Sequence, residues 1–371
     1  MSPNEKKAKI LIFNPYGSNT GGGSQIQGSL MEMLLRCCPG ADIQIVNLVK
    51  KAGGKVSYLR SFFQALSYYR GNIAADLFIL QSCLDPGMAV LGALARRNRT
   101  PYILIPGGDL VPSHELRIVV RNARLKSLYW RFIGKRFVRD ASAVVVTSEL
   151  EKERLVKAGI APGKFHIIPN SLPTQYYDHA HKYLQAAVVP APFPYALWLG
   201  RISDEKGLLF LLECWAKCVL TCPQAKLLLV GPVDHQDTFR GLNMCIISRG
   251  LSGSVNFLPW VDEAEKIKLI SQARCLLLPS HSESFGITVM EAIIMHTPVI
   301  ASTGTPWPQI DGVAGRWLPH ERELWANAMA DYLSPASKQY VDPEKVSGLL
   351  SQFTAAKISK KWGALLRDIN I

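Results

Sequence analysis

The sequence predicts an α/β protein made of two Rossmann-like, doubly wound domains that face a central cleft. At 371 residues the chain is too long for one ordinary core and about right for two such domains. Short apolar runs rich in β-branched residues alternate with amphipathic helical stretches, the pattern of a parallel sheet covered by helices. The alternation restarts after a proline-rich segment at residues 183–196, which is the best linker candidate.

The first half of the chain begins with the buried parallel strand KILIFNP at 9–15, followed by a glycine-rich turn and a helix from about Ser24 to Arg36. Further strands are expected at IQIVNLV, LFILQS, YILIPGG and AVVVTS, with helices between them. We assign residues 1–185 to this N-terminal domain.

The second half repeats the pattern with the strands ALWLGRI, KLLLVGP, VNFLPW, CLLLPS and PVIAS, separated by segments such as GLLFLLECWAKCVL. We assign residues 186–345 to this C-terminal domain. Residues 346–371 are expected to form a helix with no strand after it, which packs back toward the N-terminal domain. Ligands of such sheets bind at the carboxyl ends of the strands.

Positive charge is concentrated in the first half of the chain. The net charge is +13; residues 1–185 hold 25 Lys and Arg against 12 Asp and Glu, and residues 186–371 hold 17 against 17. This distribution favours a polyanionic partner, although a basic surface that maintains solubility remains an alternative. No signal peptide and no run of about 20 apolar residues is visible, so we expect a cytoplasmic protein.

Two basic segments, 50–72 and 117–140, interleave Lys and Arg with Tyr, Phe and Trp. This composition is typical of helices that lie on anionic lipid, where each basic side chain contributes on the order of 1 kcal/mol. Nucleic acid is disfavoured because no nucleic-acid-binding motif accompanies the segments. The alternative is that the apolar faces pack on the N-terminal sheet.

The glycine turn at 17–25 follows the first strand and opens a helix, where a dinucleotide fold keeps its phosphate loop. It does not fit G-x-G-x-x-G in register, and no acidic residue ends the second strand, so NAD is not expected. Gly21, Gly22 and Gly23 indicate either a close approach to the backbone or a flexible turn.

In the second half, Arg201 follows a strand and Lys206 begins the next helix. A guanidinium and an ammonium at this edge suit a diphosphate, although isolated cations at strand ends are also common on solvated surfaces.

The stretch PSHSESFGITVMEAIIMHTPVIAS at 279–302 places Glu283 before a turn and Glu291 inside the apolar helix that follows. The backbone N–H groups of Gly286, Ile287 and Thr288 are the donors expected at the start of that helix, where phosphate binds. A carboxylate one turn inside can accept hydrogen bonds from two vicinal hydroxyls, as in dinucleotide folds. Helix capping explains Glu283 in part and leaves Glu291 without a reason. The pattern therefore points to a nucleoside diphosphate joined to another polyol.

The E-x7-E spacing in ESFGITVME, with GRISDEKG upstream and PVIASTGTPWPQIDGVAGRW downstream, resembles glycosyltransferase family 4, the retaining nucleotide-sugar transferases of GT-B fold. The likeness is strongest over about 190–320 and is supported in the first half by VVVTSELEKERL and IIPNSL.

The resemblance implies roles for particular residues. Arg201 and Lys206 would bind the pyrophosphate of the donor, Glu283 would lie near the transferred sugar, and Glu291 would hold the ribose. The distal phosphate would be held by the backbone amides of Ser284, Phe285, Gly286, Ile287 and Thr288. The turn with Gly22 and Gly23 would close over the donor, and Asn170 matches a frequent family asparagine near the hinge. No metal is expected, because the sequence lacks D-x-D and protein cations can offset the diphosphate charge.

One position departs from the family pattern. Many relatives carry a histidine in the turn after the strand that here ends YILIPGGDL, and the matching residue is Gly107. Asp109 is expected either to serve as an acceptor-side base or sugar contact, or to cap the next segment.

The sequence thus predicts a retaining, metal-independent hexosyltransferase, peripheral on the inner face of the membrane. Its acceptor would be a lipid-linked or cell-surface glycan such as a polysaccharide or lipopolysaccharide intermediate. Two alternatives stay open: a nucleotide-sugar epimerase of the same architecture, and a non-catalytic sugar-nucleotide-binding protein. The sequence predicts no oligomeric state.

Overall fold

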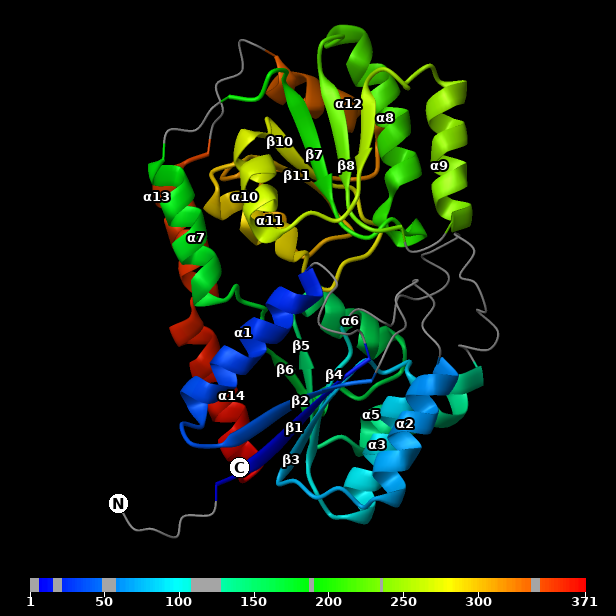
Figure 1. Cartoon of the computed structure of the whole chain (residues 1–371), viewed down its shortest axis with the longest axis vertical. Helices are drawn as coiled ribbons and strands as arrows, with labels where there is room; N and C mark the ends of the chain where they lie inside the picture. The colour runs from blue at the N-terminus through cyan, green and yellow to red at the C-terminus, as the bar shows by residue number, and fades with distance from the viewer. Residues whose placement is uncertain are drawn as a thin grey trace. The chain divides into compact units, whose positions relative to one another are not determined.

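The computed structural model describes residues 7–15, 22–48, 58–107, 128–186, 190–233, 236–334 and 341–371. The chain divides into two compact units (Figure 1). The first contains the residues up to Ser171 together with Ala355–Ile371, and the second is Leu172–Thr354. Each unit is a parallel sheet covered by helices, which confirms the predicted fold class.

The sheet of the first unit has six parallel strands in the order β2-β1-β3-β4-β5-β6. Its inner strands are apolar throughout because helices cover both faces, as parallel sheets require. The strands are β1 Lys9–Asn14, β2 Asp42–Asn47, β3 Leu77–Gln81, β4 Tyr102–Ile105, β5 Ala143–Val146 and β6 Phe165–Ile167.

The sheet of the second unit also has six parallel strands, in the order β12-β11-β10-β7-β8-β9. The strand order turns back on itself at β7 and β10, and the carboxyl ends of such central strands are where doubly wound sheets bind ligands. The strands are β7 Tyr195–Leu199, β8 Lys226–Val230, β9 Val255–Leu258, β10 Cys275–Leu278, β11 Val299–Ser302 and β12 Gly315–Leu318.

Four of the helices begin after a capping residue. Asp85, Ser148, Asp262 and Asp342 each accept a hydrogen bond from the first turn of the helix they precede. The helices of the first unit are α1 Gly22–Cys37, α2 Tyr58–Arg70, α3 Pro86–Arg97, α5 Lys135–Asp140, α6 Glu149–Lys157 and α14 Ala355–Asp368; those of the second are α7 Thr174–Gln185, α8 Leu208–Thr221, α9 Gln236–Ser248, α10 Glu263–Gln272, α11 Ile287–Ile294, α12 Arg322–Leu333 and α13 Pro343–Leu350.

The division between the units differs from the expected linker at 183–196. The chain leaves the first unit at Ser171, and α7 belongs to the second unit. The reason is packing: Tyr176 and Ala180 of α7 share one apolar core with Tyr195 and Leu197 of β7. The prolines before β7 therefore connect two elements of the same unit.

The C-terminal segment, expected as one helix over 346–371, forms two helices in different units. Val346 and Leu349 of α13 belong to the core of the second unit. The helix α14 packs on α1 in the first unit, where its apolar residues lie in one core with those of α1: Ile358, Trp362, Leu365 and Leu366 with Leu30, Met33 and Leu34.

Within the described ranges, no helix is both long and apolar enough to cross a membrane. Of the two basic aromatic segments, the structure describes residues 58–72 and 128–140. The second contains a π-helical turn at Trp130–Gly134 that runs into α5.

Candidate functional site

The strands β7 and β10 are neighbours in the second sheet, so their carboxyl ends bring two loops together. Cys275 pairs with Ala196 in parallel register. A Cβ atom at Gly207 would lie 2.0 Å from the Pro279 carbonyl oxygen, and Gly207 has φ +69°. Only glycine allows the segment after β7 to lie so close to the segment after β10.

Lys206 and Glu283 form an ion pair across these two loops. Nζ of Lys206 donates to Oε1 of Glu283 at 2.5 Å, and the side chains are only 16% and 14% exposed. The Ser280 hydroxyl donates to the same oxygen at 3.2 Å. Both charged residues were site candidates from the sequence, and the structure brings them into direct contact.

Arg201 lies in the loop after β7, half-exposed and 3.8 Å from Oε1 of Glu205. The Ser203 hydroxyl donates to that same oxygen at 2.7 Å. Burial opposes ionisation of Glu205, but Lys206, Ser203 and Arg201 outweigh it and hold the pKa of its carboxyl below the usual range. The loop thus carries two cations together with an ionised carboxylate.

The helix α11 starts directly after the loop that contains Glu283. Gly286 precedes it with φ +82°, and a Cβ there would lie 3.0 Å from the Leu278 side chain. In the part of the chain that is described, the N–H group of Val289 donates to Gly286 O at 3.0 Å, whereas the structure gives no acceptor for those of Ile287 and Thr288. These donors and the helix dipole favour an anion at this end.

The Phe285 side chain is buried in the core beneath this turn. Its ring packs at 5.2 Å from the Trp307 ring, and Trp307 Nε1 donates to the Phe285 carbonyl oxygen. The side chain therefore holds the turn in place, and the phosphate contact of the Phe285 backbone amide that the resemblance implies stays a prediction.

Glu291 has a partner that the sequence did not reveal. Its side chain is 1% exposed, and Lys266 of α10 donates to its Oε1 at 2.6 Å. The same Nζ atom lies 5.4 Å from the ring centre of Tyr176 on α7. Among the described residues, no hydrogen bond or ion pair connects Glu291 or Lys266 with Lys206. The convergence of Lys206, Arg201 and Glu291 on one ligand therefore stays a prediction.

Site candidates in the first unit lie at the ends of its elements. Gly22 and Gly23 form the first turn of α1, two residues before the expected helix start. Asn170 is half-buried in the loop after β6, directly before the chain passes to the second unit. Gly107 has φ +65°, a conformation that favours glycine. Asp109 lies outside the described residues.

A row of carboxamides at the carboxyl ends of three strands was not expected from the sequence. Asn14 Nδ2 donates to Asn47 Oδ1 at 3.3 Å, and Gln27 of α1 donates to Gln81 at the end of β3. Gln27 and Gln81 are buried. Polar residues at successive strand ends were the available signal, but the contact with α1 depends on how that helix packs.

Comparison with known proteins identifies the family. The profile described as Glycosyl transferases group 1 matches residues 193–334, and the profile described as Glycosyl transferase 4-like domain matches residues 38–171. Together the two matches cover most of the chain and both units. The chain belongs to glycosyltransferase family 4.

Relatives and solved structures agree with this membership. A D-inositol 3-phosphate glycosyltransferase of Saccharomonospora viridis is 28% identical over 242 residues, which is 60% of this chain and 56% of that protein. The chain thus spans about half the length of the curated relatives that it matches.

Two solved structures share the fold of this family 4 protein. Anabaena HepE in complex with UDP-glucose has TM-score 0.73 and 18% identity, covering 97% of this chain and 99% of that one. The lipopolysaccharide outer core galactosyltransferase WaaB has TM-score 0.64 and 15% identity, again covering 97% and 99%.

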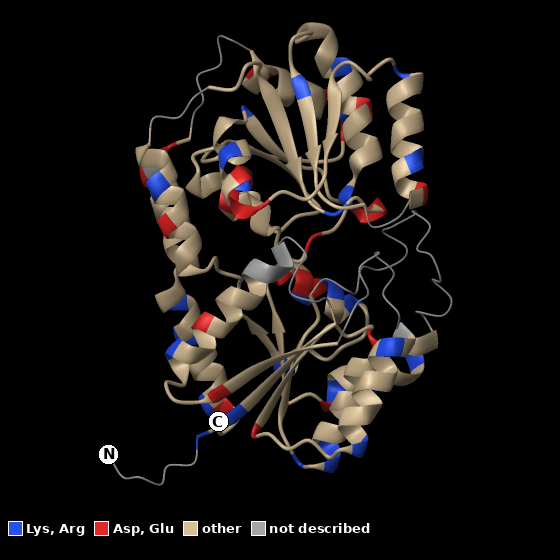
Figure 2. Ribbon diagram, in the orientation of Figure 1, with Lys and Arg blue, Asp and Glu red and all other residues tan. Residues whose placement is uncertain are grey.

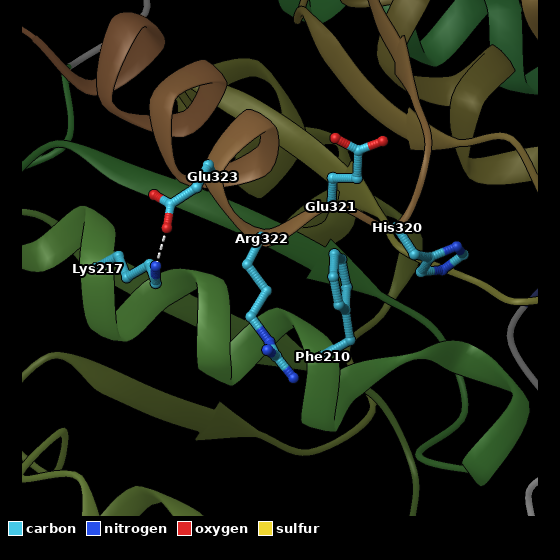
Figure 3. A pocket seen from close by; sticks show the side chains of 6 residues that line it. All are labelled: Phe210, Lys217, His320, Glu321, Arg322 and Glu323. Carbon is cyan, nitrogen blue, oxygen red and sulfur yellow. Dashed lines mark hydrogen bonds and ion pairs between the residues drawn. The ribbon is translucent and has the colours of Figure 1, made fainter.

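A separate hollow of about 450 Å³ lies on the family 4 protein between α8 and the start of α12 (Figure 3). Three of its four charged lining residues are already paired: Lys217 contacts Glu323, and Arg322 contacts Glu213 at 2.6 Å. One of its lining residues, His320, stacks its ring on His281 in the loop of Glu283, with the ring centres 4.5 Å apart. We therefore place the candidate site at the strand ends and not in this hollow.

Among the described residues there is no group of three or more His, Cys, Asp or Glu that could hold a metal ion. The cations available at the strand ends are side chains of the protein itself, Arg201 and Lys206.

Proposed function

We propose that the protein is a retaining, metal-independent hexosyltransferase that uses a nucleoside-diphosphate sugar as donor. The observation that carries this proposal is the Lys206–Glu283 pair at 2.5 Å, at the edge of the sheet where α11 begins. A lysine beside an open helix N-terminus can bind a diphosphate, and a carboxylate beside it can accept hydrogen bonds from a sugar. These are the two parts of a nucleotide sugar.

In this proposal Lys206 and Arg201 offset the negative charge that develops on the departing diphosphate, and the first amides of α11 hold its distal phosphate. The bond from the anomeric carbon to the phosphate oxygen breaks, and a bond to the acceptor hydroxyl forms on the same face. The acceptor proton passes to the departing phosphate. Glu283 orients the sugar hydroxyls. Asp109 remains part of the proposal, either as a base that takes the acceptor proton in place of the phosphate or as a sugar contact.

The donor class is supported by the solved structures of similar fold, among which HepE was determined with UDP and glucose and with UDP-glucose. The acceptor class has weaker support because the similar proteins differ. The curated relatives are named for D-inositol 3-phosphate, whereas WaaB and WaaG are named for lipopolysaccharide. We propose a lipid-linked or cell-surface saccharide.

The transfer assay uses a panel of UDP-, GDP- and ADP-hexoses with lipopolysaccharide core, lipid-linked saccharide and inositol phosphate as acceptors. We expect a saccharide product with the anomeric configuration of the donor by NMR, formed equally with EDTA present. Inositol phosphate as the preferred acceptor would overturn the acceptor class alone. Conversion of the donor without an acceptor would indicate an epimerase, and donor binding without turnover a non-catalytic protein.

We also propose that the first unit docks on the inner face of the cell membrane. Large apolar side chains stand exposed on α2 and on the turn before α5, beside arginines; Figure 2 shows Lys and Arg prevailing over Asp and Glu on these helices. The exposed side chains are Leu59, Phe63, Leu128, Phe132 and Ile133. Apolar groups that insert and cations that stay at the headgroups are the requirements for an interfacial surface.

Liposome flotation tests the docking. Vesicles with 30% phosphatidylglycerol should carry the protein upward, and the double variant Phe63→Ser/Phe132→Ser should lose most of this binding. Met244→Ser serves as the matched control, because Met244 is as exposed on α9 of the second unit. Binding that ignores both anionic lipid and salt would refute the membrane proposal.

A further inference from the structure

Three polar side chains from α7, α10 and α11 meet in the second unit with hydrogen-bonding capacity left over. We infer that Tyr176 and Lys266 complete, together with Glu291, a site for the vicinal hydroxyls of a pentose. Tyr176 would contact the sugar directly, and Lys266 would position the carboxylate. This inference deepens the proposed function and rests on it, since the pentose would be the ribose of the nucleotide.

The carboxylate of Glu291 is buried and has Lys266 as its charged partner. Burying a carboxylate costs free energy unless a partner offsets the lost hydration, and the ammonium 2.6 Å away is such a partner. Across the described ranges, Lys266 donates to Oε1 and the structure gives Oε2 no partner. An ionised carboxylate with one oxygen occupied by a fixed lysine has the other available as an acceptor.

Tyr176 supplies the second group. Its side chain is 1% exposed, and its hydroxyl has no hydrogen-bond partner in the described part of the chain. A buried hydroxyl without a partner loses its hydration with no compensation, so a ligand hydroxyl at this position would restore a bond already missing. Burial first, and then the nearby charge of Glu291, raise the pKa of the Tyr176 phenol, which stays protonated and can donate.

The Lys266 ammonium lies between the two groups. It donates to Glu291 and stands 5.4 Å from the Tyr176 ring centre, a distance at which a cation is attracted to the ring. One ammonium therefore holds the carboxylate and the phenol in one arrangement. His179 of α7 and Glu263 of α10 also contact each other, at 2.6 Å.

The chemistry of this cluster suits a neutral diol and not a phosphate. The cluster carries one lysine and one carboxylate, so it offers no net positive charge to an anion. Acceptor and donor groups side by side instead match hydroxyls that both donate and accept. The position on α11 agrees, because Glu291 lies about 6 Å along the helix axis from Ile287, where the phosphate is expected.

Calorimetry of nucleoside diphosphates tests Tyr176. The ligand is whichever of UDP, GDP and ADP binds wild type most tightly, compared with its 2′-deoxy and 3′-deoxy forms. We expect Tyr176→Phe to reduce the preference for the ribose form by about fivefold, the value of one hydrogen bond. The matched control is Tyr195→Phe, since this buried phenol of the same core already donates to Leu269 O at 2.7 Å.

Binding of the same ligands by a Lys266 variant tests that residue. In Lys266→Met the buried Glu291 carboxylate loses the cation that fixes it, so the preference for the ribose form over the deoxy forms should fall by about fivefold or more. The control is Lys268→Met, whose lysine is half-exposed on the same helix and pairs with Glu265.

The outcomes separate this inference from the function on which it rests. If wild type binds nucleoside diphosphates while Tyr176→Phe and Lys266→Met both keep the full ribose preference, the cluster is only a structural ion pair and the inference is wrong. If wild type binds none of the three diphosphates, the proposed function fails and the inference falls with it.

Discussion

Both units contain a parallel sheet whose strands end at one edge, but the side chains at the carboxyl ends of the strands differ between the units. In the first unit the described strand ends carry the carboxamides of Asn14, Asn47 and Gln81, with Gln27 above them. In the second unit the same edge carries Lys206 and Glu283 in direct contact. Neutral amides suit hydroxyl-rich ligands, whereas cations beside a helix N-terminus suit phosphates.

This contrast runs against the distribution of charge along the sequence. Residues 1–185 hold the whole positive excess, 25 basic against 12 acidic residues, yet their described strand ends are uncharged. The balanced half, 17 against 17, has Arg201 and Lys206 at the candidate site. Net charge therefore does not locate the ligand site, whereas the local placement of cations indicates it.

Removing the Lys206 cation from the strand ends of the second unit should have the largest effect. Lys206→Met is expected to lower kcat for hexose transfer by roughly 100- to 1,000-fold, because one fixed charge facing the leaving diphosphate is lost. Steady-state kinetics with the preferred donor measure this. Lys217→Met is the control, since that lysine pairs with Glu323 away from the site. Equal rates in Lys206→Met and wild type would mean that the diphosphate does not bind at Lys206.

Glu291→Ala should have the next largest effect. We expect nucleotide affinity to fall by about tenfold or more, because a charge-assisted hydrogen bond to the ribose is lost. The free energy of unfolding should also fall, by about 3 kcal/mol or more, since Lys266 is left buried without its partner. Calorimetry and urea unfolding measure the two effects, and an unchanged nucleotide affinity would contradict the ribose role.

Substitutions of the carboxamides at the strand ends of the first unit should weaken binding of the acceptor and leave binding of the donor unchanged. Replacing Gln27 and Gln81 together by Leu removes both partners of one buried hydrogen bond, so the fold should tolerate it. We expect the acceptor KM to rise about fivefold or more with the donor KM unchanged. The control Gln44→Leu lies exposed on β2. An equal rise in the donor KM would contradict the assignment of the acceptor to the strand ends of the first unit and of the donor to those of the second.

The smallest expected effect concerns Glu205. Its folded pKa is lowered, so its contribution to stability is present above the ordinary value of 4.5 and is lost as pH falls from there through the folded pKa. Glu205→Gln should therefore lower Tm modestly at pH 7, and the gap to wild type should close in that acidic window. A gap that stays constant down to pH 3 would indicate that the pairing with Arg201 and Lys206 has no such effect.

The fold could be predicted from the sequence because buried parallel strands are short and apolar, as KILIFN and KLLLV are. The division between units could not, since prolines at 183–196 signal a break in secondary structure and not which core α7 joins. Glu283 and Lys206 were found through a local motif. Lys266 and Tyr176 were missed because their contact with Glu291 arises only when α7 and α10 pack on α11.

The central claim is that the second unit binds a diphosphate through Lys206 at the carboxyl ends of β7 and β10. Calorimetric titration of wild type and Lys206→Met with the preferred nucleoside diphosphate, and with the same nucleoside lacking phosphates, tests it most directly. The account predicts that wild type binds the diphosphate far more tightly than the nucleoside, and that Lys206→Met loses most of this advantage while binding the nucleoside unchanged. An advantage of the same size in both proteins would contradict it.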